Sequence, residues 1–386
     1  MSPSTSRRSP WRPSRLQAGE RPAPEQRNRR KRTVSNETSA ALPTSMSASV
    51  LVAPLTVELR EVPVPSLEPD QVLVKITAIG VCGSDTHFFT EGHIGDLVVD
   101  GPLILGHESA GRIVAVGSAI AADRVGERVS IEPQKPCRVC EFCKSGQYNL
   151  CPAMEFYGAP GTDGAFSEYA VIQSDFAHSV PDSLSDAASA LIEPLSVAIY
   201  ACRKAGITAG SKVLVAGAGP IGVVITQVAK AFGATVVIVA DPVQERRDTV
   251  LRFGATRVID PISEDVAALD PAVDIFIDAS GAGRAVQSGI RAVRSGGRVV
   301  LVGMGQVDLE LPVALVQMRE IELTGIYRYA NTWPVAIELA SSGVIDLDSL
   351  VTGVFGLGEV AEALLKAGTD PTALKTVVVP GWTGTA

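Results

Sequence analysis

The chain has 386 residues, a length that favours two domains over one. Its hydrophobic share of 46% allows a large core, and a low aromatic share of 5% beside many Ala, Val, Gly and Ile residues is typical of an α/β protein. The net charge of −8 is uneven, because residues 1–45 hold ten Arg and Lys against three Glu, which gives +7 there and −15 in the rest. Such an acidic body argues against a nucleic-acid-binding protein.

Residues 1–45 are rich in Pro, Ser and Arg with almost no apolar clusters, so we expect a disordered basic extension. An export signal at "SRRSPW" is excluded because no apolar segment follows it, whereas "RNRRKR" leaves a nuclear or nucleic-acid tail as an alternative. If the extension is an over-long start, Met46 opens the folded protein. No run of 18 apolar residues exists, which predicts a soluble, cytoplasmic protein with no membrane partner.

Residues 46–195 form the first part of a domain that we expect to be rich in β-strands. Apolar residues alternate in short segments divided by Pro and Gly, a pattern typical of half-buried strands. The clearest are 72–81, 111–117 and 127–133. Among the remaining His and Cys residues, we expect His178 in a loop and Cys202 in the core. His93 lies on a loop near the predicted site and could face substrate.

Residues 196–330 change to alternating strands and helices. The expected elements are, in chain order, strand 212–219, helix 220–233, strand 235–241, helix 242–254, strands 257–260 and 273–281, helix 283–297 and strand 298–303. Repeated βα units predict a doubly wound parallel sheet. Residues 331–386, with a helix at 357–368 and a strand at 375–380, then complete the β-rich domain.

A glycine loop follows the first strand of this second domain. Gly217, Gly219 and Gly222 have the GxGxxG spacing, which permits a tight turn, close approach of a pyrophosphate and close packing of strand and helix. Asp241 ends the next strand, where a carboxylate binds a ribose diol and repels a 2′-phosphate, so the loop predicts NAD over NADP. Arg246 weakens this preference, because a nearby cation could accept a phosphate.

Four cysteines lie within fifteen residues, at Cys137, Cys140, Cys143 and Cys151. Four soft ligands on one short loop fit a closed, structural zinc site, with an iron–sulfur site or free thiols as the alternatives. A second group is dispersed: Cys82, Ser84, Asp85, His87, His107, Glu108 and Glu193. Cys, His and Glu ligands from several elements suit a catalytic metal with one open position.

Each dispersed residue also has an ordinary structural explanation. Cys82 could be a small buried apolar residue, His107 a hydrogen-bonded core histidine, and Glu193 an acid that favours a helix N-terminus. Their occurrence together beside a nucleotide-type domain favours the metal site.

The segment from Gly106 through His107 and Glu108 to Gly111, Gly117 and Ile120 resembles the signature of zinc-containing medium-chain alcohol dehydrogenases. "GVCGSDTH", the cysteine lobe and "GAGPIG" agree with it over residues 46–386, and "RYANTWPVAIELASSG" is most similar to the sorbitol (polyol) dehydrogenases. The resemblance implies a Rossmann sheet inserted into a β-rich, GroES-like catalytic domain. It also implies a homotetramer or homodimer.

The resemblance also implies roles for single residues. Cys82 and His107 would bind the catalytic zinc, with either Glu108 or Glu193 beside them, and Ser84 and His87 would relay the alcohol proton. Arg328 and Tyr329 would contact substrate, whereas Phe88 stands where the polyol group often has a tyrosine. The coenzyme contacts would be Ile221, Asp241, Arg246, Val302, Gly303, Met304, Ile326, Tyr327 and Arg328.

The activity expected from this likeness is oxidation of a polyol such as sorbitol or xylitol to a ketose, with hydride transfer to NAD and two zinc ions per chain. Three alternatives remain. They are another alcohol such as threonine, idonate, glucose or a vicinal diol; a zinc-binding nucleic-acid protein; and a crystallin-like protein that binds coenzyme without turnover.

Overall fold

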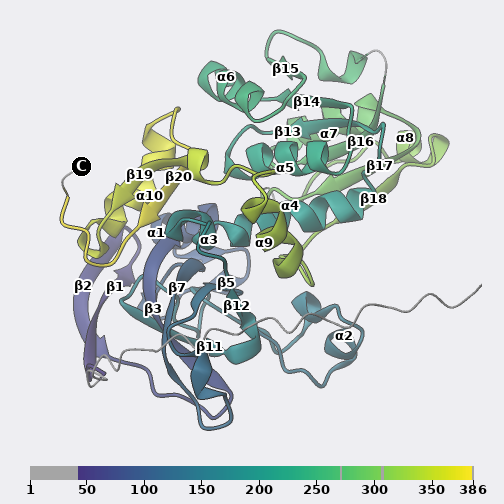
Figure 1. Cartoon of the computed structure of the whole chain (residues 1–386). Coiled ribbons are helices and arrows are strands. Elements are labelled where there is room, and N and C mark those ends of the chain that lie inside the picture. The colour runs from purple at the N-terminus through teal and green to yellow at the C-terminus, as the bar shows by residue number, and fades with distance from the viewer. Residues whose placement is uncertain (1–41, 270–271, 306–307, 385–386) are drawn as a thin grey trace, which may run out of the picture. The chain divides into compact units, whose positions relative to one another are not determined.

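The computed structural model describes residues 42–269, 272–305 and 308–384 (Figure 1). Within this part, one sheet is entirely parallel and a second region is rich in antiparallel strands, so the expected α/β class is confirmed. Most of the basic extension predicted for residues 1–45 lies outside the described residues. None of the helices in the described ranges has the length and hydrophobicity that a membrane span requires.

The parallel sheet has six strands in the order β15-β14-β13-β16-β17-β18. The reversal of strand order between β13 and β16 is where doubly wound sheets bind nucleotides. The strands are β13 (Lys212–Ala216), β14 (Val236–Ala240), β15 (Arg257–Ile259), β16 (Val273–Asp278), β17 (Val293–Leu301) and β18 (Glu322–Gly325).

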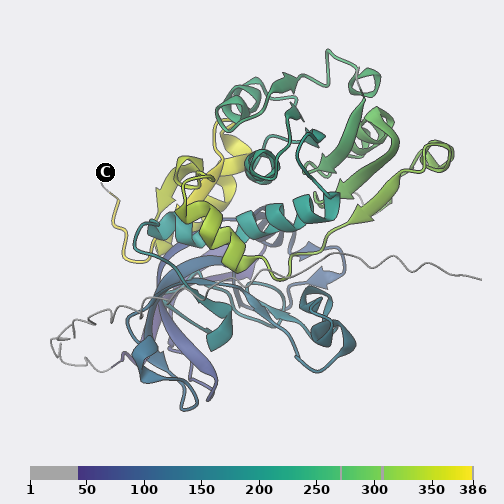
Figure 2. The same cartoon turned by 45° about the vertical axis from the view of Figure 1, so that its right-hand side comes forward.

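Both faces of this sheet are buried, which explains why its central strands are continuous apolar runs. Val213 and Val215 of β13 pack against α4 (Ile192–Ala205), α5 (Pro220–Ala231) and α9 (Trp333–Ser341). Leu214 and Ala216, the alternate residues, pack against α7 (Gly283–Ala292) on the other face. Figures 1 and 2 show these helices around the sheet.

One expected element is wrong in part. The helix predicted for 283–297 ends at Ala292, and β17 begins at Val293, five residues before the strand expected at 298. Val293 is fully buried and pairs with Val273, whereas Gly296 has a φ of 67° that no helix contains. A buried β-branched residue followed by two glycines favours the strand.

The β-rich region is built on a seven-stranded sheet. Its main order is β12 (Ala177–Ser179), β8 (Arg128–Ile131), β7 (Glu108–Val116), β3 (Gln71–Gly80), β20 (Lys375–Val378) and β19 (Val351–Phe355), with β11 (Tyr169–Gln173) also paired to β3. Because β20 pairs with β3, the end of the chain completes a sheet begun near its start. His178 lies in β12 and not in the expected loop.

Smaller sheets and short helices complete the region. The strands are β1 (Ser45–Ala53), β2 (Thr56–Pro63) and β6 (Leu103–Ile104) in one sheet, β4 (His93–Ile94) with β5 (Leu97–Val98), and β9 (Gln134–Lys135) with β10 (Glu155–Phe156). The other helices are α1 (Gly83–Glu91), α2 (Glu141–Lys144), α3 (Asp186–Ala190), α6 (Gln244–Arg252), α8 (Val313–Met318) and α10 (Val360–Thr369).

Candidate active site

The His-Glu pair stands at the start of β7, just after a glycine whose backbone no other residue adopts easily. Gly106 has a φ of 93°, and an added Cβ would lie 3.0 Å from the Phe166 ring. This turn places His107 and Glu108 inside the protein, where both are buried.

Asp85 ties His107 to Cys82. Its carboxylate accepts hydrogen bonds from the backbone N–H of Cys82 at 3.0 Å and of Gly106 at 3.1 Å, and lies 3.4 Å from Nδ1 of His107. Burial alone would raise the pKa of Asp85, but the charge and hydrogen bond of His107 lower it below the usual value. The sequence offered a signal, since an acid three residues after a helix N-cap favours a capping box, which α1 contains.

Glu108 is paired with a residue that sequence reasoning missed. Oε1 of Glu108 forms a buried ion pair with Nζ of Lys375, which also donates to the Val81 carbonyl at 2.8 Å. Burial opposes the charge of Lys375, but the Glu108 carboxylate raises its pKa above the usual value. The other oxygen, Oε2, is buried and has no hydrogen-bond partner among the described residues.

Ligand atoms of Cys82, His107 and Glu108 all lie within 4.8 Å of one another. A thiolate, an imidazole and a carboxylate are the donor types of catalytic zinc sites, and the unpartnered Oε2 of Glu108 is an oxygen that a metal would satisfy. The residues therefore fit a zinc ion. Glu193 accepts a hydrogen bond from Tyr329 Oη at 2.7 Å, and burial raises its pKa to about 7.

A cavity of about 360 Å³ collects most of the predicted site residues. From the β-rich region and α4 it is lined by Cys82, Ser84, His87, Phe88, His107 and Glu193, and from the parallel-sheet region by Ile221, Val302, Gly303, Met304, Ile326, Tyr327 and Arg328. Glu108 and Tyr329 are fully buried and do not line this cavity. Tyr329 is connected to it through the hydrogen bond from its hydroxyl to Glu193, which does line it. A larger cavity of about 480 Å³ beside β1 and β11 holds none of the predicted residues.

Among the described residues, Arg328 supplies the one guanidinium that lines this cavity. Its Cζ lies 4.0 Å from the ring centroid of Phe156 and 4.7 Å from that of Tyr327, and no hydrogen bond to another described residue engages it. Burial lowers its pKa below the usual value. Phe156, which the sequence did not single out, also packs against the His107 ring at 5.3 Å. A half-buried cation with free donors can bind hydroxyl or carboxylate oxygens.

The glycine loop joins β13 to α5 as expected. Gly217 has a φ of 95°, and a Cβ on Gly222 would lie 1.8 Å from the Gly217 carbonyl, so neither position accepts a side chain. A Cβ on Gly219 would meet nothing within 4 Å, which leaves room for a ligand at the N-terminus of α5. The strand, turn and helix therefore fit a dinucleotide.

Asp241, just after β14, and Arg246, in α6, differ in how they are held. Asp241 is buried, and its two oxygens accept from the backbone N–H groups of Ala218 and Val243, both at 2.8 Å. Arg247 donates to the Asp241 carbonyl. Nε of Arg246 is buried without a partner among the described residues, so its guanidinium remains free to meet a ligand.

The four lobe cysteines form the second group of close ligand atoms, again within 4.8 Å of one another. Sγ of Cys143 lies 3.4 Å from that of Cys140 and 4.0 Å from that of Cys137. A tetrahedral zinc ion with bonds of about 2.3 Å requires separations of roughly 3.8 Å, so the thiols fit this metal. All six cysteines of the chain are free, which excludes disulfides here.

Comparison with known proteins agrees with this geometry. Residues 68–182 match the family model of the alcohol dehydrogenase GroES-like domain, and residues 220–342 match that of the zinc-binding dehydrogenases. The sorbitol dehydrogenase of Bacillus subtilis (strain 168) is 40% identical over 333 residues, which cover 84% of this chain and 94% of the relative.

Two solved structures show the same fold. L-idonate 5-dehydrogenase from Escherichia coli K-12 superposes with a TM-score of 0.82 at 30% identity, over 87% of this chain and 98% of that one. An alcohol dehydrogenase from Escherichia coli CFT073, complexed with NADH, has a TM-score of 0.82 at 30% identity, over 87% of this chain and all of that one.

Proposed function

The chain belongs to the zinc-binding medium-chain dehydrogenase family and is a zinc-dependent alcohol or polyol dehydrogenase, and we propose that it oxidises a secondary hydroxyl of sorbitol, xylitol or a similar polyol to a ketose with NAD. The observation that carries the proposal is the cavity in which Cys82, His107 and Glu193 face the coenzyme-side residues. Family membership favours this enzyme over a zinc-binding nucleic-acid protein or a coenzyme-binding protein without turnover.

Cys82, His107 and Glu108 would hold the catalytic zinc, with Glu193 lining the cavity beside them. The support for Glu108 over Glu193 is that its atoms group with those of Cys82 and His107, while Tyr329 already occupies an oxygen of Glu193. When bound, the zinc ion supplies a Lewis acid that lowers the pKa of an alcohol.

The remaining residues would orient the alcohol and remove its proton. Ser84 lines the cavity and would accept the hydroxyl proton, and His87 is exposed at its edge with Nδ1 2.9 Å from Glu91. Arg328, which has free donors, would bind a second hydroxyl, and Tyr329 would hold Glu193 in place. Phe88 supplies an apolar wall and no hydrogen bond.

The coenzyme would lie on the loop of Gly217, Gly219 and Gly222, with its pyrophosphate at the N-terminus of α5. Asp241 would bind the adenosine ribose and favour NAD, and Arg246 would determine how strictly NADP is excluded. Val302, Gly303, Met304, Ile326 and Tyr327 would contact the nicotinamide half. The four lobe cysteines would bind a second, structural zinc, and reduced thiols of this kind suit the cytoplasm.

The test is a substrate panel on zinc-replete protein, with NADH formation as the readout. We expect kcat/KM for sorbitol or xylitol to exceed that for L-threonine, glucose, L-idonate and 2,3-butanediol by at least tenfold. A Cys82→Ser variant should lose turnover while still binding NAD. Preference for idonate, favoured by one structural neighbour, or for butanediol would refute the polyol assignment and leave the dehydrogenase family intact.

A further inference from the structure

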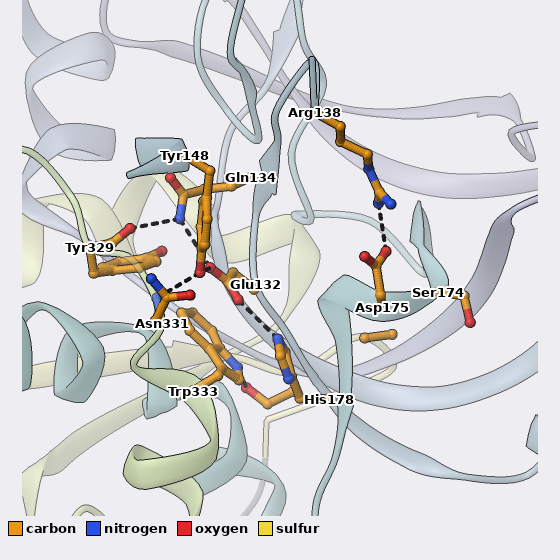
Figure 3. A network of polar contacts seen from close by, with 12 residues as sticks. Glu132, Gln134, Arg138, Tyr148, Ser174, Asp175, His178, Tyr329, Asn331 and Trp333 are labelled. Carbon is orange, nitrogen blue, oxygen red and sulfur yellow. Dashed lines mark hydrogen bonds and ion pairs between the residues drawn. The ribbon is translucent and has the colours of Figure 1, made fainter. Parts of the chain in front are cut away.

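A buried carboxylate lies outside the cavity, and the proposed chemistry does not use it. Glu132 follows β8 and is only 3% exposed. Its Oε1 accepts hydrogen bonds from Tyr148 Oη at 2.7 Å and Gln134 Nε2 at 3.2 Å, and its Oε2 lies 2.9 Å from His178 Nε2 (Figure 3). Three side chains from different parts of the sequence therefore converge on one acid.

Two of these partners hold the backbone of the segment that leads from β18 to α9. Nε2 of Gln134 also donates to the Tyr329 carbonyl at 3.1 Å. Oη of Tyr148 accepts from the backbone N–H of Asn331 at 2.8 Å (Figure 3). Glu132 thus orients two of the groups that hold this segment, one on either side of residue 330, while Asn149 and Arg203 donate to the carbonyls of Tyr327 and Asn331.

This segment needs external support because its backbone is strained. Arg328 has a φ of 56° and Asn331 one of 57°, although neither is a glycine. Such conformations are unfavourable for residues with a Cβ and persist where surrounding contacts impose them. The first of the two is the residue whose guanidinium lines the cavity. Its position in the cavity therefore depends on the contacts that hold residues 329–331.

The third partner of Glu132 anchors the end of the same segment. The His178 ring stacks on the Trp333 indole, with centroids 5.7 Å apart and planes 27° from parallel. Nε1 of Trp333 donates to Ser130 Oγ at 3.1 Å, and Trp333 is the first residue of α9. His178 consequently lies between Glu132 and the point where the segment ends.

We propose that Glu132, with His178, is a positioning residue for alcohol recognition. Through Gln134, Tyr148 and Trp333 it holds residues 328–331 in their strained conformation and so places the Arg328 guanidinium in the cavity. It touches neither substrate nor coenzyme. The proposal rests on the alcohol dehydrogenase activity and on Arg328 facing the alcohol, and it does not depend on which alcohol is the substrate.

The experiment compares Glu132→Ala, Glu132→Gln and Asp175→Ala in the full-length, zinc-replete enzyme with the best alcohol of the panel. We expect Glu132→Ala to raise KM for the alcohol at least tenfold, with kcat changed less than threefold and Kd for NAD less than twofold. KM rises while kcat stays nearly constant when a variant loses an interaction that stabilises the bound substrate and the transition state equally. Asp175 pairs with Arg138 at the surface and contacts no residue of segment 328–331, so its variant should match wild type.

Glu132→Gln should restore KM to within threefold of wild type. Its amide oxygen can accept from Tyr148 and Gln134, and its amide nitrogen can donate to His178 in the other tautomer. Should Glu132→Ala not fold, Gln134→Met removes the amide donor that Glu132 and the Tyr329 carbonyl share and leaves the bonds of Glu132 to Tyr148 and His178 in place. An unchanged KM in a folded variant, an equal rise in Asp175→Ala, or failure of the glutamine rescue would overturn the proposal.

Discussion

Lys375 is a buried cation that does not line the cavity. It and Glu108 are buried charges that neutralise each other, and the pair joins the last strand of the chain to the His-Glu turn. A buried ion pair adds little net stability, but removing one partner leaves an uncompensated charge in a dry environment. The pair also orients the carboxylate that we assign to zinc, in the way that outer partners orient metal ligands.

Replacing Lys375 with Met should therefore reduce both stability and catalytic zinc. We expect a loss of about 3–5 kcal/mol in the free energy of unfolding and a 10- to 100-fold weaker affinity for one of the two zinc ions. Thermal unfolding and metal analysis after dialysis against a weak chelator measure the two effects.

Lys366→Met is the matched control, because Lys366 forms a partly exposed pair with Asp370 at 3.0 Å. Pairs of this kind contribute roughly 0–1 kcal/mol, so this variant should keep both zinc ions and nearly all of its stability. Full zinc retention by Lys375→Met would contradict the role of Glu108 as a ligand.

Phe88 offers a second test at the scale of a residue, since it lines the cavity and is 4% exposed. Phe88→Tyr adds one hydroxyl to an apolar wall, and a net hydrogen bond contributes about 1 kcal/mol, or roughly fivefold in binding. We expect KM for sorbitol to fall by about that factor while KM for 2,3-butanediol stays unchanged. Phe89→Tyr, at a buried position outside the cavity lining, should not alter the ratio of the two KM values.

At the scale of elements, the cysteine lobe should behave as an independent metal site. Cys140, the residue just before α2, supplies one of the four thiolates. We expect Cys140→Ser to reduce bound zinc from two ions per chain to one. Metal analysis checks the stoichiometry. Cys202→Ala, in the core of α4 as the sequence predicted, should keep both ions. Equal loss of zinc in the two variants would refute the assignment.

The elements also show why some features could be predicted and others not. The glycine loop and the cysteine lobe were recognisable because all their residues lie within a short stretch, whose spacing alone fixes the geometry. The Glu108–Lys375 pair spans 267 residues, so only the sheet pairing of β20 with β3 brings it together. The predicted end of the helix that begins at residue 283 was wrong. Its helical periodicity was extended past Ala292, but Val293 pairs with Val273 in the parallel sheet and starts β17 there.

At the scale of the whole molecule, the β18 edge of the parallel sheet is the surface at which we expect a second copy of the chain to bind. Strand β18 is an end strand, its Leu323 is 38% exposed, and the preceding α8 exposes Val313 and Met318. The opposite edge, β15, is only three residues long and carries Arg257 paired with Glu264. Charged residues at an edge discourage pairing, and β18 carries one charged residue, Glu322, which is paired with Arg298; exposed apolar residues and unpaired backbone groups, which β18 and α8 also present, invite pairing.

We therefore predict that two copies of the chain pair through β18 about a twofold axis, because a strand can meet its own copy in antiparallel register. Leu323→Asp should shift the protein toward monomers in sedimentation velocity runs at micromolar concentration. Val354→Asp is the matched control, since Val354 is 39% exposed on β19, the edge of the other sheet. A monomeric wild type would refute the predicted pairing, and dissociation caused by Val354→Asp and not by Leu323→Asp would place the interface elsewhere. If the β18 pairing holds, the strand that leads directly into segment 328–331 is braced from outside by the second copy.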